Sequence, residues 1–519
     1  MIHRIRQFQQ KHPFLFIMVI ALLVRLVAVL FSRGFLFNHD HFLLIETAQS
    51  WIDGRDYPGW LPWTPGNEGP AGTNMFFVLF HYMFLQLIHW LGIYDPQVKM
   101  LLVRAIHAFL SLLVVSFGYR MASLVAEKRT AYRLALLLAV FWFMPFISVR
   151  NMAEMVSAPF FMYGTLIILR QELIRRNHEP GYHLSSFMFA GFFLGLAFSV
   201  WFPALIYVMG LWSALLLLRN FKGMLSAAGG FLIATTLIQA SIDLLLWRVP
   251  FAEFITYISN SFANLANLSL QPWHYYPTVY LLALILPLSL MLLYGFFRGA
   301  RQHFILYAPV TLFILVHLFL PDKQFRYLLP VMPLFILLGL SGWDRMISFS
   351  AFWRKNPRTH TALWTIFWVL NISLLLWVTV MYPNRSRVEA MQYLSKYETV
   401  DRLLVDDRFN ETIRPMPLFY LKQWPEVKYL SGHQSYASFL EPYANTMPDL
   451  QPDFVLLYED IHMDKRVDSL KHYLPDLKFE TRFKPGWTDR LILHLFPSTE
   501  NKIIYIYRNT ASQPLKIID

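Results

Sequence analysis

The chain has 519 residues, of which 56% are hydrophobic and 15% charged, and its mean hydropathy is +0.40. This composition excludes an ordinary soluble protein and indicates a membrane protein that crosses the bilayer several times. The absence of cysteine excludes disulfides, thiolate catalysis and thiolate metal sites.

The net charge of +12 is unevenly distributed along the chain. Residues 1–381 hold 27 Lys and Arg against 14 Asp and Glu, whereas residues 382–519 hold 18 against 19. The basic excess is confined to the apolar part, where basic residues in short loops mark the cytoplasmic side of a membrane. This distribution excludes nucleic acid as a partner and makes membrane lipids the expected surroundings.

Long apolar segments divide residues 1–381 into spans. The first follows a basic start but no small-residue cleavage site, so we expect it to be retained. Segment 75–92 is expected to be a re-entrant or interfacial helix, because counting it as a span inverts the charge bias of the later loops. About eleven transmembrane helices are expected, with the N-terminus inside and the C-terminus outside: 13–33, 101–124, 131–149, 152–170, 186–201, 203–218, 224–247, 277–297, 303–320, 327–342 and 361–381.

This topology places most acidic residues of the membrane part at the outer surface. Ionisable residues in or against a bilayer are functional candidates, so we expect the active site to face the periplasm of a bacterium or the lumen of the endoplasmic reticulum. Arg25, inside the first span, needs a partner, for which Asp243 is a candidate. The outer acids are Asp40, Glu46, Asp53, Asp56, Glu68, Glu154, Glu253 and Asp322.

The first outer loop, 34–100, is too long for a simple connection. It opens with the ionisable run Asn38-His39-Asp40-His41, directly after the first span. The apolar stripe of 41–54 predicts an amphipathic helix in the interface plane, where a lipid headgroup would be presented. The alternative is a capping loop with interfacial aromatic residues.

Two later outer segments carry further polar motifs. One contains Gln271-Pro272-Trp273-His274-Tyr275-Tyr276, and the other is the charged turn 321–330 between two apolar helices. A third early outer turn holds Arg150 and Glu154.

These segments resemble motifs of the C-type glycosyltransferases (GT-C), specifically the glycosyltransferase family 22 mannosyltransferases that build GPI anchors and N-glycan precursors. Asn38-His39-Asp40-His41 is similar to the family's His-Pro-Asp-Glu-like motif. Residues 272–276 are similar to its Pro-Trp-His-Trp-Tyr motif, and 323–330 to its His-Lys-Glu-x-Arg-Phe-Leu-x-Pro motif. Arg150 matches an early luminal arginine. The resemblance covers most of residues 1–345. His41 replaces the family's acid, and Asp322 and Gln324 replace its His and Glu.

The resemblance implies a GT-C fold and the transfer, with inversion, of mannose or a similar hexose from a polyprenyl-phosphate donor to a glycan, lipid or protein acceptor. Such a reaction needs a base for the acceptor hydroxyl, and Asp40 is the candidate. The alternative reading is that Asp40 caps the helix that follows it.

The histidines beside Asp40 are candidate substrate contacts. His39, Asp40 and His41 also have the side chains of a divalent-metal site. Three consecutive residues rarely converge on one ion, because alternate side chains of an extended run point apart. We therefore expect no metal and no other cofactor.

The negative charge that develops on the leaving phosphate needs cations to stabilise it, and Lys323, Arg326 and Arg150 are the candidates. The alternative for any one of them is snorkelling to lipid headgroups, and Asp322 could pair with one. His274 could donate a hydrogen bond to phosphate or acceptor. Trp273 and Tyr275 could bind substrate or form an interfacial aromatic belt, and Glu154 could orient the acceptor or pair with Arg150.

Residues 382–519 have the composition of a soluble domain outside the membrane. Helices at 387–397 and 465–473 alternate with strands at 402–405, 454–458, 491–495 and 502–507, which predicts a small α/β domain. No nucleotide-binding glycine fingerprint occurs, in keeping with a lipid-linked donor. The domain could bind the acceptor or cap the loops.

The alternative to an enzyme is a transporter or flippase of lipid-linked sugars. Transporters tend to have internal repeats and charges near the bilayer midplane. Here the charges lie in outer loops, which favours the enzyme over this alternative.

Overall fold

The computed structural model describes residues 2–519 except 68, 265–270, 300–302, 410–412, 433, 435, 438–439, 442–450, 488, 491–501, 513–515 and 517–519, and without the side chains of residues 2, 4–6, 39 and 264. Outer acid Glu68 and the expected strand 491–495 lie outside the described residues. The chain divides into two compact units. Unit 1 comprises Met1–Phe31, Gly59–Phe80 and Leu102–Val380, and unit 2 comprises Ser32–Pro58, His81–Leu101 and Met381–Asp519.

The two units differ from the expected domains, 1–381 and 382–519, in where the first outer loop belongs. Ser32–Pro58 and His81–Leu101 group with the C-terminal residues, whereas Gly59–Phe80 groups with the membrane helices. Two helices, α5 (Met75–Trp90) and α6 (Pro96–Val125), contribute to both units.

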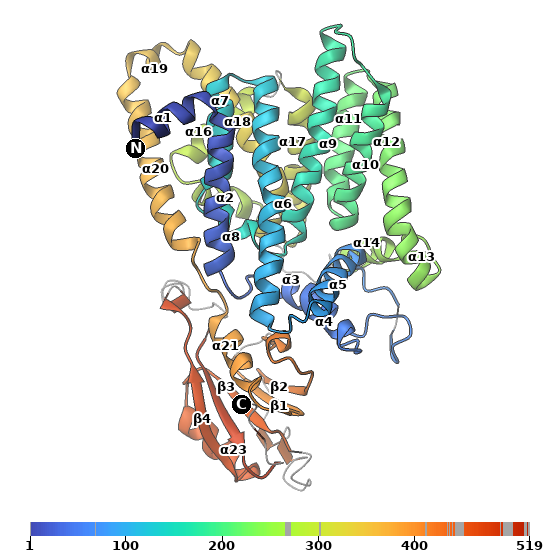
Figure 1. Cartoon of the computed structure of the whole chain (residues 1–519), viewed down its shortest axis with the longest axis vertical. Helices are drawn as coiled ribbons and strands as arrows, with labels where there is room; N and C mark the ends of the chain where they lie inside the picture. Colours follow the sequence, from blue (N-terminus) through green and yellow to red (C-terminus); the bar gives the residue numbers. More distant parts are fainter. Residues whose placement is uncertain are drawn as a thin grey trace. The chain divides into compact units, whose positions relative to one another are not determined.

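Unit 1 is helical (Figure 1). Among the described residues, five of its helical segments are long and apolar enough to cross a membrane, and four further apolar helices are shorter. The exact number of spans stays a prediction. Its other helices are α1 (Ile2–Lys11), α2 (Pro13–Phe31), α7 (Lys128–Val140), α8 (Met144–Ser148), α9 (Ala153–Arg176), α10 (Leu184–Val200), α11 (Ala204–Leu217), α12 (Phe221–Thr235), η2 (Thr236–Ala240), α13 (Ser241–Trp247), α14 (Ala252–Asn264), α15 (Tyr275–Ala283), α16 (Leu288–Gly299), α17 (Phe304–Phe319), η3 (Phe325–Val331), α18 (Met332–Phe349), α19 (Ala351–Lys355) and α20 (Pro357–Val378).

Two expected spans are interrupted. Residues 277–297 form α15 and α16, which meet at 120°. Pro287, between them, has no N–H to donate to a continuing helix. Residues 131–149 form α7 and the short α8, with Pro145 in the first turn of α8.

Side chains from other helices bind the backbone at the α7–α8 break. Asn371 on α20 donates from Nδ2 to the carbonyl of Val140 (2.8 Å) and accepts at Oδ1 from the N–H of Trp142 (2.9 Å). Arg25 on α2 donates to the carbonyls of Ala139 (3.2 Å) and Leu138 (3.3 Å). The last carbonyls of α7, which have no partner within the helix, are thereby bonded.

The expected pairing of Arg25 with Asp243 is wrong. Besides the carbonyls of α7, Arg25 donates to Ser111 Oγ (2.6 Å). Asp243 accepts from Gln239 Nε2 (3.0 Å) and from the N–H of Glu253 (3.3 Å).

Helices of unit 1 approach closely where glycine replaces a side chain. A Cβ on Gly230 of α12 would lie 1.8 Å from the carbonyl oxygen of Met188 on α10, and one on Gly191 of α10 would lie 1.9 Å from that of Ala227 on α12. Gly295 of α16 and Gly339 of α18 form a similar contact. Small residues are typical of such interfaces in membranes, because the backbones can then pack directly.

Unit 2 holds the helix expected at 41–54, but its surroundings differ from the expectation. Asn38–Asp40 (α3), the π-helical segment His41–Glu46 (η1) and Thr47–Ile52 (α4) form one helical stretch. All residues from Asp40 to Ser50 except 42 and 43 are buried. Because this stretch is buried on more than one face, it lacks the exposed polar face of an amphipathic helix, and its interfacial position stays a prediction.

A five-stranded sheet forms the C-terminal part of unit 2 (Figure 1). The order is β2-β1-β3-β5-β4; β1 pairs in parallel with β2 and β3, and β5 pairs antiparallel with β3 and β4. The small α/β domain is confirmed. Its elements are α21 (Arg385–Leu394), β1 (Arg402–Asp407), η4 (Leu418–Tyr420), β2 (Glu426–Ser431), β3 (Phe454–Tyr458), α23 (Met463–Tyr473), β4 (Leu477–Phe483) and β5 (Ile504–Asn509).

We predict that Gly230→Ala destabilises the α10–α12 pair, since the new methyl must displace a backbone carbonyl at a cost of about 1–3 kcal/mol. The matched control is Gly229→Ala, because a Cβ there meets nothing within 4 Å. The measurement is the apparent melting temperature of purified protein in detergent, which should fall for Gly230→Ala only. Equal melting temperatures for both variants would contradict the close packing.

We also predict that Asn371→Leu lowers the apparent melting temperature. Leucine leaves the buried carbonyl of Val140 without this partner, at a cost of about 1–3 kcal/mol, and the partly buried N–H of Trp142 also loses its bond. Ser373→Ala is the control, since the exposed Ser373 hydroxyl bonds only Val369 of its own helix. An unchanged melting temperature for Asn371→Leu would mean that the break does not need this side chain.

Candidate active site

Arg326, one of the predicted cations of the 321–330 turn, lies in a polar cluster of unit 1, which we call the Arg326 cluster: Glu154, Asp322, Gln324, Arg326 and Tyr327. Nε of Arg326 lies 3.3 Å from Glu154 Oε1 and donates to Gln324 Oε1 (2.9 Å). Asp322 accepts from the hydroxyl of Tyr327 (2.8 Å) and from Gln324 Nε2 (3.2 Å). Because Arg326 and Glu154 are 5% and 3% exposed, this ion pair is poorly hydrated.

Two elements position this cluster. η3 carries Arg326 and Tyr327 and continues directly into α18. Glu154 lies in the first turn of α9, where its negative charge is favoured by the helix dipole. Arg150, 4% exposed just before α9, has its guanidinium carbon 4.7 Å from the ring centroid of Phe146.

The turn also joins the segment that holds the Trp-His-Tyr motif. Lys323, which is 4% exposed, donates from Nζ to the carbonyls of Gln271 (2.9 Å) and Leu320 (2.7 Å). Tyr280 on α15 donates to the carbonyl of Phe325 (2.5 Å). The two motifs, about fifty residues apart in sequence, are therefore neighbours in unit 1.

The residues of the Trp-His-Tyr motif differ in exposure. Trp273 is 71% exposed and His274 is exposed, with their ring centroids 5.8 Å apart, edge to face. Tyr275 is partly buried at the start of α15. Trp273 and His274 are thus available to a ligand or to lipid headgroups, whereas Tyr275 is held closer to the protein.

Sequence reasoning missed Tyr257 in this region and gave Glu253, one of the outer acids, no specific role. Tyr257 on α14 has a raised pKa, first because of burial and then because Glu154 and Asp322 oppose its ionisation, so it lies near the Arg326 cluster. Glu253 accepts from the N–H groups of Gly72 (2.6 Å) and Thr73 (3.0 Å) and from Trp247 Nε1 (2.9 Å). Burial raises the pKa of Glu253, while these hydrogen bonds oppose the shift.

A cavity of about 820 Å³ in unit 1 lies between α6, α9 and α10, with Arg120 and Arg170 in its wall. Arg170 is sixteen residues after Glu154 on α9, or about 24 Å along the helix. The cavity is therefore at the opposite end of α9 from the Arg326 cluster.

In unit 2, Asp40 is 5% exposed and lies inside the helical stretch. Its backbone is helical (φ −69°, ψ −26°), and its side chain makes no capping hydrogen bond to the next segment. The alternative interpretation of Asp40 as a helix cap is therefore wrong. The side chain of His39 lies outside the described residues.

His41 lies in the core of unit 2. Its ring stacks on Phe35 (4.5 Å between centroids) and Tyr420 (5.5 Å), and Nε2 lies 3.4 Å from Glu46 Oε1. Glu46 also accepts from the N–H of Phe419 (3.1 Å). Burial raises the pKa of Glu46, with His41 and Phe419 opposing.

Arg387 on α21, also missed from the sequence, connects the Asp40 segment to the C-terminal residues within unit 2. It donates to Asn38 Oδ1 (3.1 Å) and Asn384 Oδ1 (3.2 Å), and lies over the rings of Phe35 and Phe42. Among the described residues, no group of three His, Asp or Glu side chains could hold a metal ion.

Solved structures of ArnT share the fold at low sequence identity. Crystal structures of ArnT from Cupriavidus metallidurans align with TM-scores of 0.61 (bound to undecaprenyl phosphate, 12% identity) and 0.56 (apo state, 13% identity). They cover 96% of this chain and 99% and 98% of those chains. The archaeal oligosaccharyltransferase AglB from Archaeoglobus fulgidus aligns at 0.49 with 13% identity, covering 92% of this chain and 74% of that one. Comparison with curated protein sequences gave no match.

The fold is that of the GT-C glycosyltransferases, and the apolar helices make this an integral membrane protein. A model of the Alg9-like mannosyltransferase family matches residues 15–412, about three quarters of the sequence. The family resemblance drawn from the three motifs is confirmed: the chain belongs to the Alg9-like mannosyltransferase family.

Proposed function

We propose that this protein transfers mannose or a similar hexose from a polyprenyl-phosphate donor to a glycan- or lipid-linked acceptor at the extracytoplasmic face of its membrane. The observation that carries the proposal is the buried Arg326–Glu154 pair beside Lys323, in a chain of a mannosyltransferase family. The ArnT structure with bound undecaprenyl phosphate, which has the same fold, supports a lipid phosphate as the leaving group.

The proposed reaction is a direct displacement. The acceptor hydroxyl oxygen attacks the anomeric carbon of the donor sugar, its bond to the phosphate oxygen breaks, and the configuration inverts. Asp40 takes the hydroxyl proton, and the polyprenyl phosphate leaves with the bonding electron pair. A carboxylate suits this role when it lies within hydrogen-bond reach of the acceptor hydroxyl.

The cations stabilise the charge that develops on the leaving phosphate. The guanidinium of Arg326 carries a permanent positive charge, and Lys323 has a third ammonium hydrogen beyond the two carbonyls it binds. Arg150 is the third cation. His39, His41, Glu154, Trp273, His274 and Tyr275 stay proposed substrate contacts.

The extracytoplasmic location of the site is supported by the charge pattern of the sequence. Most basic residues gather in one set of loops and most acids in the other. The proposed host membrane is the bacterial inner membrane or the endoplasmic reticulum.

We predict that Asp40→Asn lowers the rate of transfer by about 10²–10⁴-fold, because asparagine cannot accept the proton. The assay follows radiolabelled sugar from polyprenyl-phosphate mannose to lipid-linked glycan acceptors, using protein reconstituted in liposomes. Asp53→Asn, at the end of the same helical stretch, is the isosteric control and should stay within a few fold of wild type. Unchanged transfer by Asp40→Asn would contradict the base assignment, and movement of the lipid-linked sugar without transfer would contradict the enzyme.

A second prediction separates phosphate binding from simple charge neutralisation by Arg326. Arg326→Met should lose both stability and transfer, because it leaves Glu154 buried without its cation, at a cost of about 3–5 kcal/mol. Glu154→Gln/Arg326→Met should regain stability, measured as apparent melting temperature, but should still bind donor at least about tenfold more weakly than Glu154→Gln alone. Donor binding by the double variant equal to that of Glu154→Gln would show that Arg326 only neutralises Glu154.

A further inference from the structure

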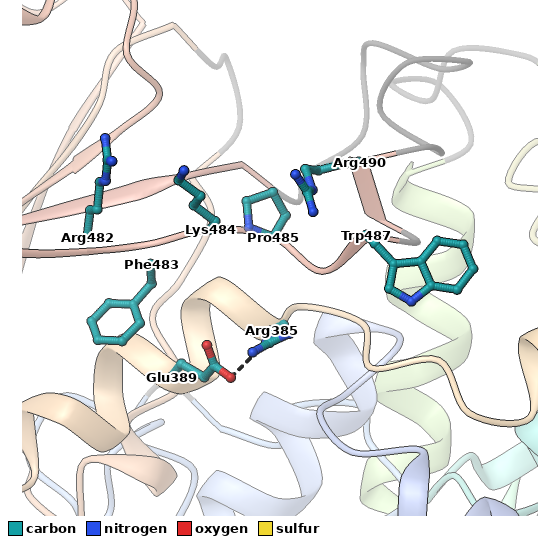
Figure 2. Close-up of a pocket in the computed structure, with 8 residues that line it drawn as sticks. All are labelled: Arg385, Glu389, Arg482, Phe483, Lys484, Pro485, Trp487 and Arg490. Atoms are coloured by element: carbon teal, nitrogen blue, oxygen red, sulfur yellow. Dashed lines mark hydrogen bonds and ion pairs between the residues drawn. The ribbon is translucent and has the colours of Figure 1, made fainter.

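A cavity of about 510 Å³ lies in unit 2 beside α21 and the end of β4 (Figure 2). The proposed transfer reaction uses none of its residues. We call it the basic cavity, and it is lined by Arg385, Glu389, Arg482, Phe483, Lys484, Pro485, Trp487 and Arg490.

Most of the positive charge in this lining is not neutralised by the protein. Nε of Arg385 pairs with Glu389 at 2.7 Å. Within the part of the chain that the structure describes, Arg482, Lys484 and Arg490 form no ion pair, and all three are exposed. Like charges gathered around one cavity repel each other, and a bound anion would remove that repulsion.

This concentration of charge is local. Residues 382–519 as a whole hold 18 basic and 19 acidic residues. Arg482 and Lys484, two residues apart in extended chain, point the same way from the end of β4. Arg490 comes from the following turn, where its N–H bonds the carbonyl of Gly486 (3.0 Å).

Two features favour an anion that belongs to a membrane. Trp487 in the cavity wall is 61% exposed, and tryptophan is enriched where proteins meet the membrane–water interface. Arg385 follows Val378, the last residue of the membrane-spanning candidate α20, by seven residues. The covalent chain alone keeps it within about 25 Å of the end of that helix.

We propose that the basic cavity binds the phosphate group of a membrane lipid, with Arg482, Lys484 and Arg490 pairing with the phosphate oxygens. Trp487 lies at the bilayer surface beside it. The proposal concerns binding alone and does not depend on the transfer reaction. It gives the C-terminal domain a recognition role separate from Asp40 and the Arg326 cluster.

The test uses the full chain in nanodiscs of neutral phosphatidylcholine. Because the sequence contains no cysteine, Gln392→Cys places a single fluorescent label three residues beyond Glu389, on the same face of α21. The probes are dioctanoyl phosphatidic acid, dioctanoyl phosphatidylcholine and inorganic pyrophosphate, each titrated against the label. We expect saturable binding of phosphatidic acid, weakened by salt, and none of phosphatidylcholine.

Arg482→Gln/Arg490→Gln should weaken phosphatidic acid binding at least about tenfold, since two charge-assisted hydrogen bonds are lost. Lys465→Gln/Lys471→Gln removes two exposed charges from α23 of the same unit and should leave binding within about twofold of wild type. Arg482→Lys/Arg490→Lys should retain most of the binding, and melting temperatures should confirm that every variant is folded. If Arg482→Gln/Arg490→Gln and Lys465→Gln/Lys471→Gln weakened phosphatidic acid binding equally, the proposed site would be wrong. If pyrophosphate bound as tightly as phosphatidic acid, the proposal of a lipid ligand would be wrong, and a soluble phosphate ester would be indicated.

Discussion

The break between α7 and α8 depends on one physical constraint: backbone N–H and carbonyl groups away from water must find partners inside the protein. Arg25 and Asn371, from the first and last membrane helices of unit 1, bond the carbonyls of Leu138, Ala139 and Val140. A buried arginine is costly on its own, but here its positive charge meets the negative end of a helix dipole. These two side chains therefore allow a helix to end within the apolar part of the chain.

The geometry of the Arg326 cluster follows from that break. Because α7 ends at Val140, α8 and the turn after it carry Arg150 to the start of α9, where Glu154 meets Arg326. A buried ion pair contributes little net stability once its desolvation is counted. Its presence agrees with the proposed function, in which a leaving phosphate develops negative charge.

The sequence predicted the helical class, most helix positions and the neighbouring Lys323 and Trp-His-Tyr motifs, because apolar runs and short motifs are local signals. Prediction from sequence failed where contacts between residues far apart in the chain determine the local structure. Pro145 was a visible sign of the α7–α8 break, but its stabilisation by Asn371 was not. The missed strands β2 and β4 are the two edges of the sheet, where charged residues interrupt the apolar pattern. Arg387 and Glu253 could not be assigned, because each acts on residues more than a hundred positions away.

The departure of this chain from its family at His41 also has a structural explanation. His41 stands where the family has an acid, yet in unit 2 it stacks between Phe35 and Tyr420 and lies beside Glu46. The side chain at position 41 therefore packs inside unit 2. Asp40, one residue earlier, is held in helical backbone by that packing and by the Arg387–Asn38 bond. The proposal that Asp40 is the general base therefore concerns a carboxylate carried on a rigid stretch of backbone, which limits the directions from which an acceptor hydroxyl can reach it.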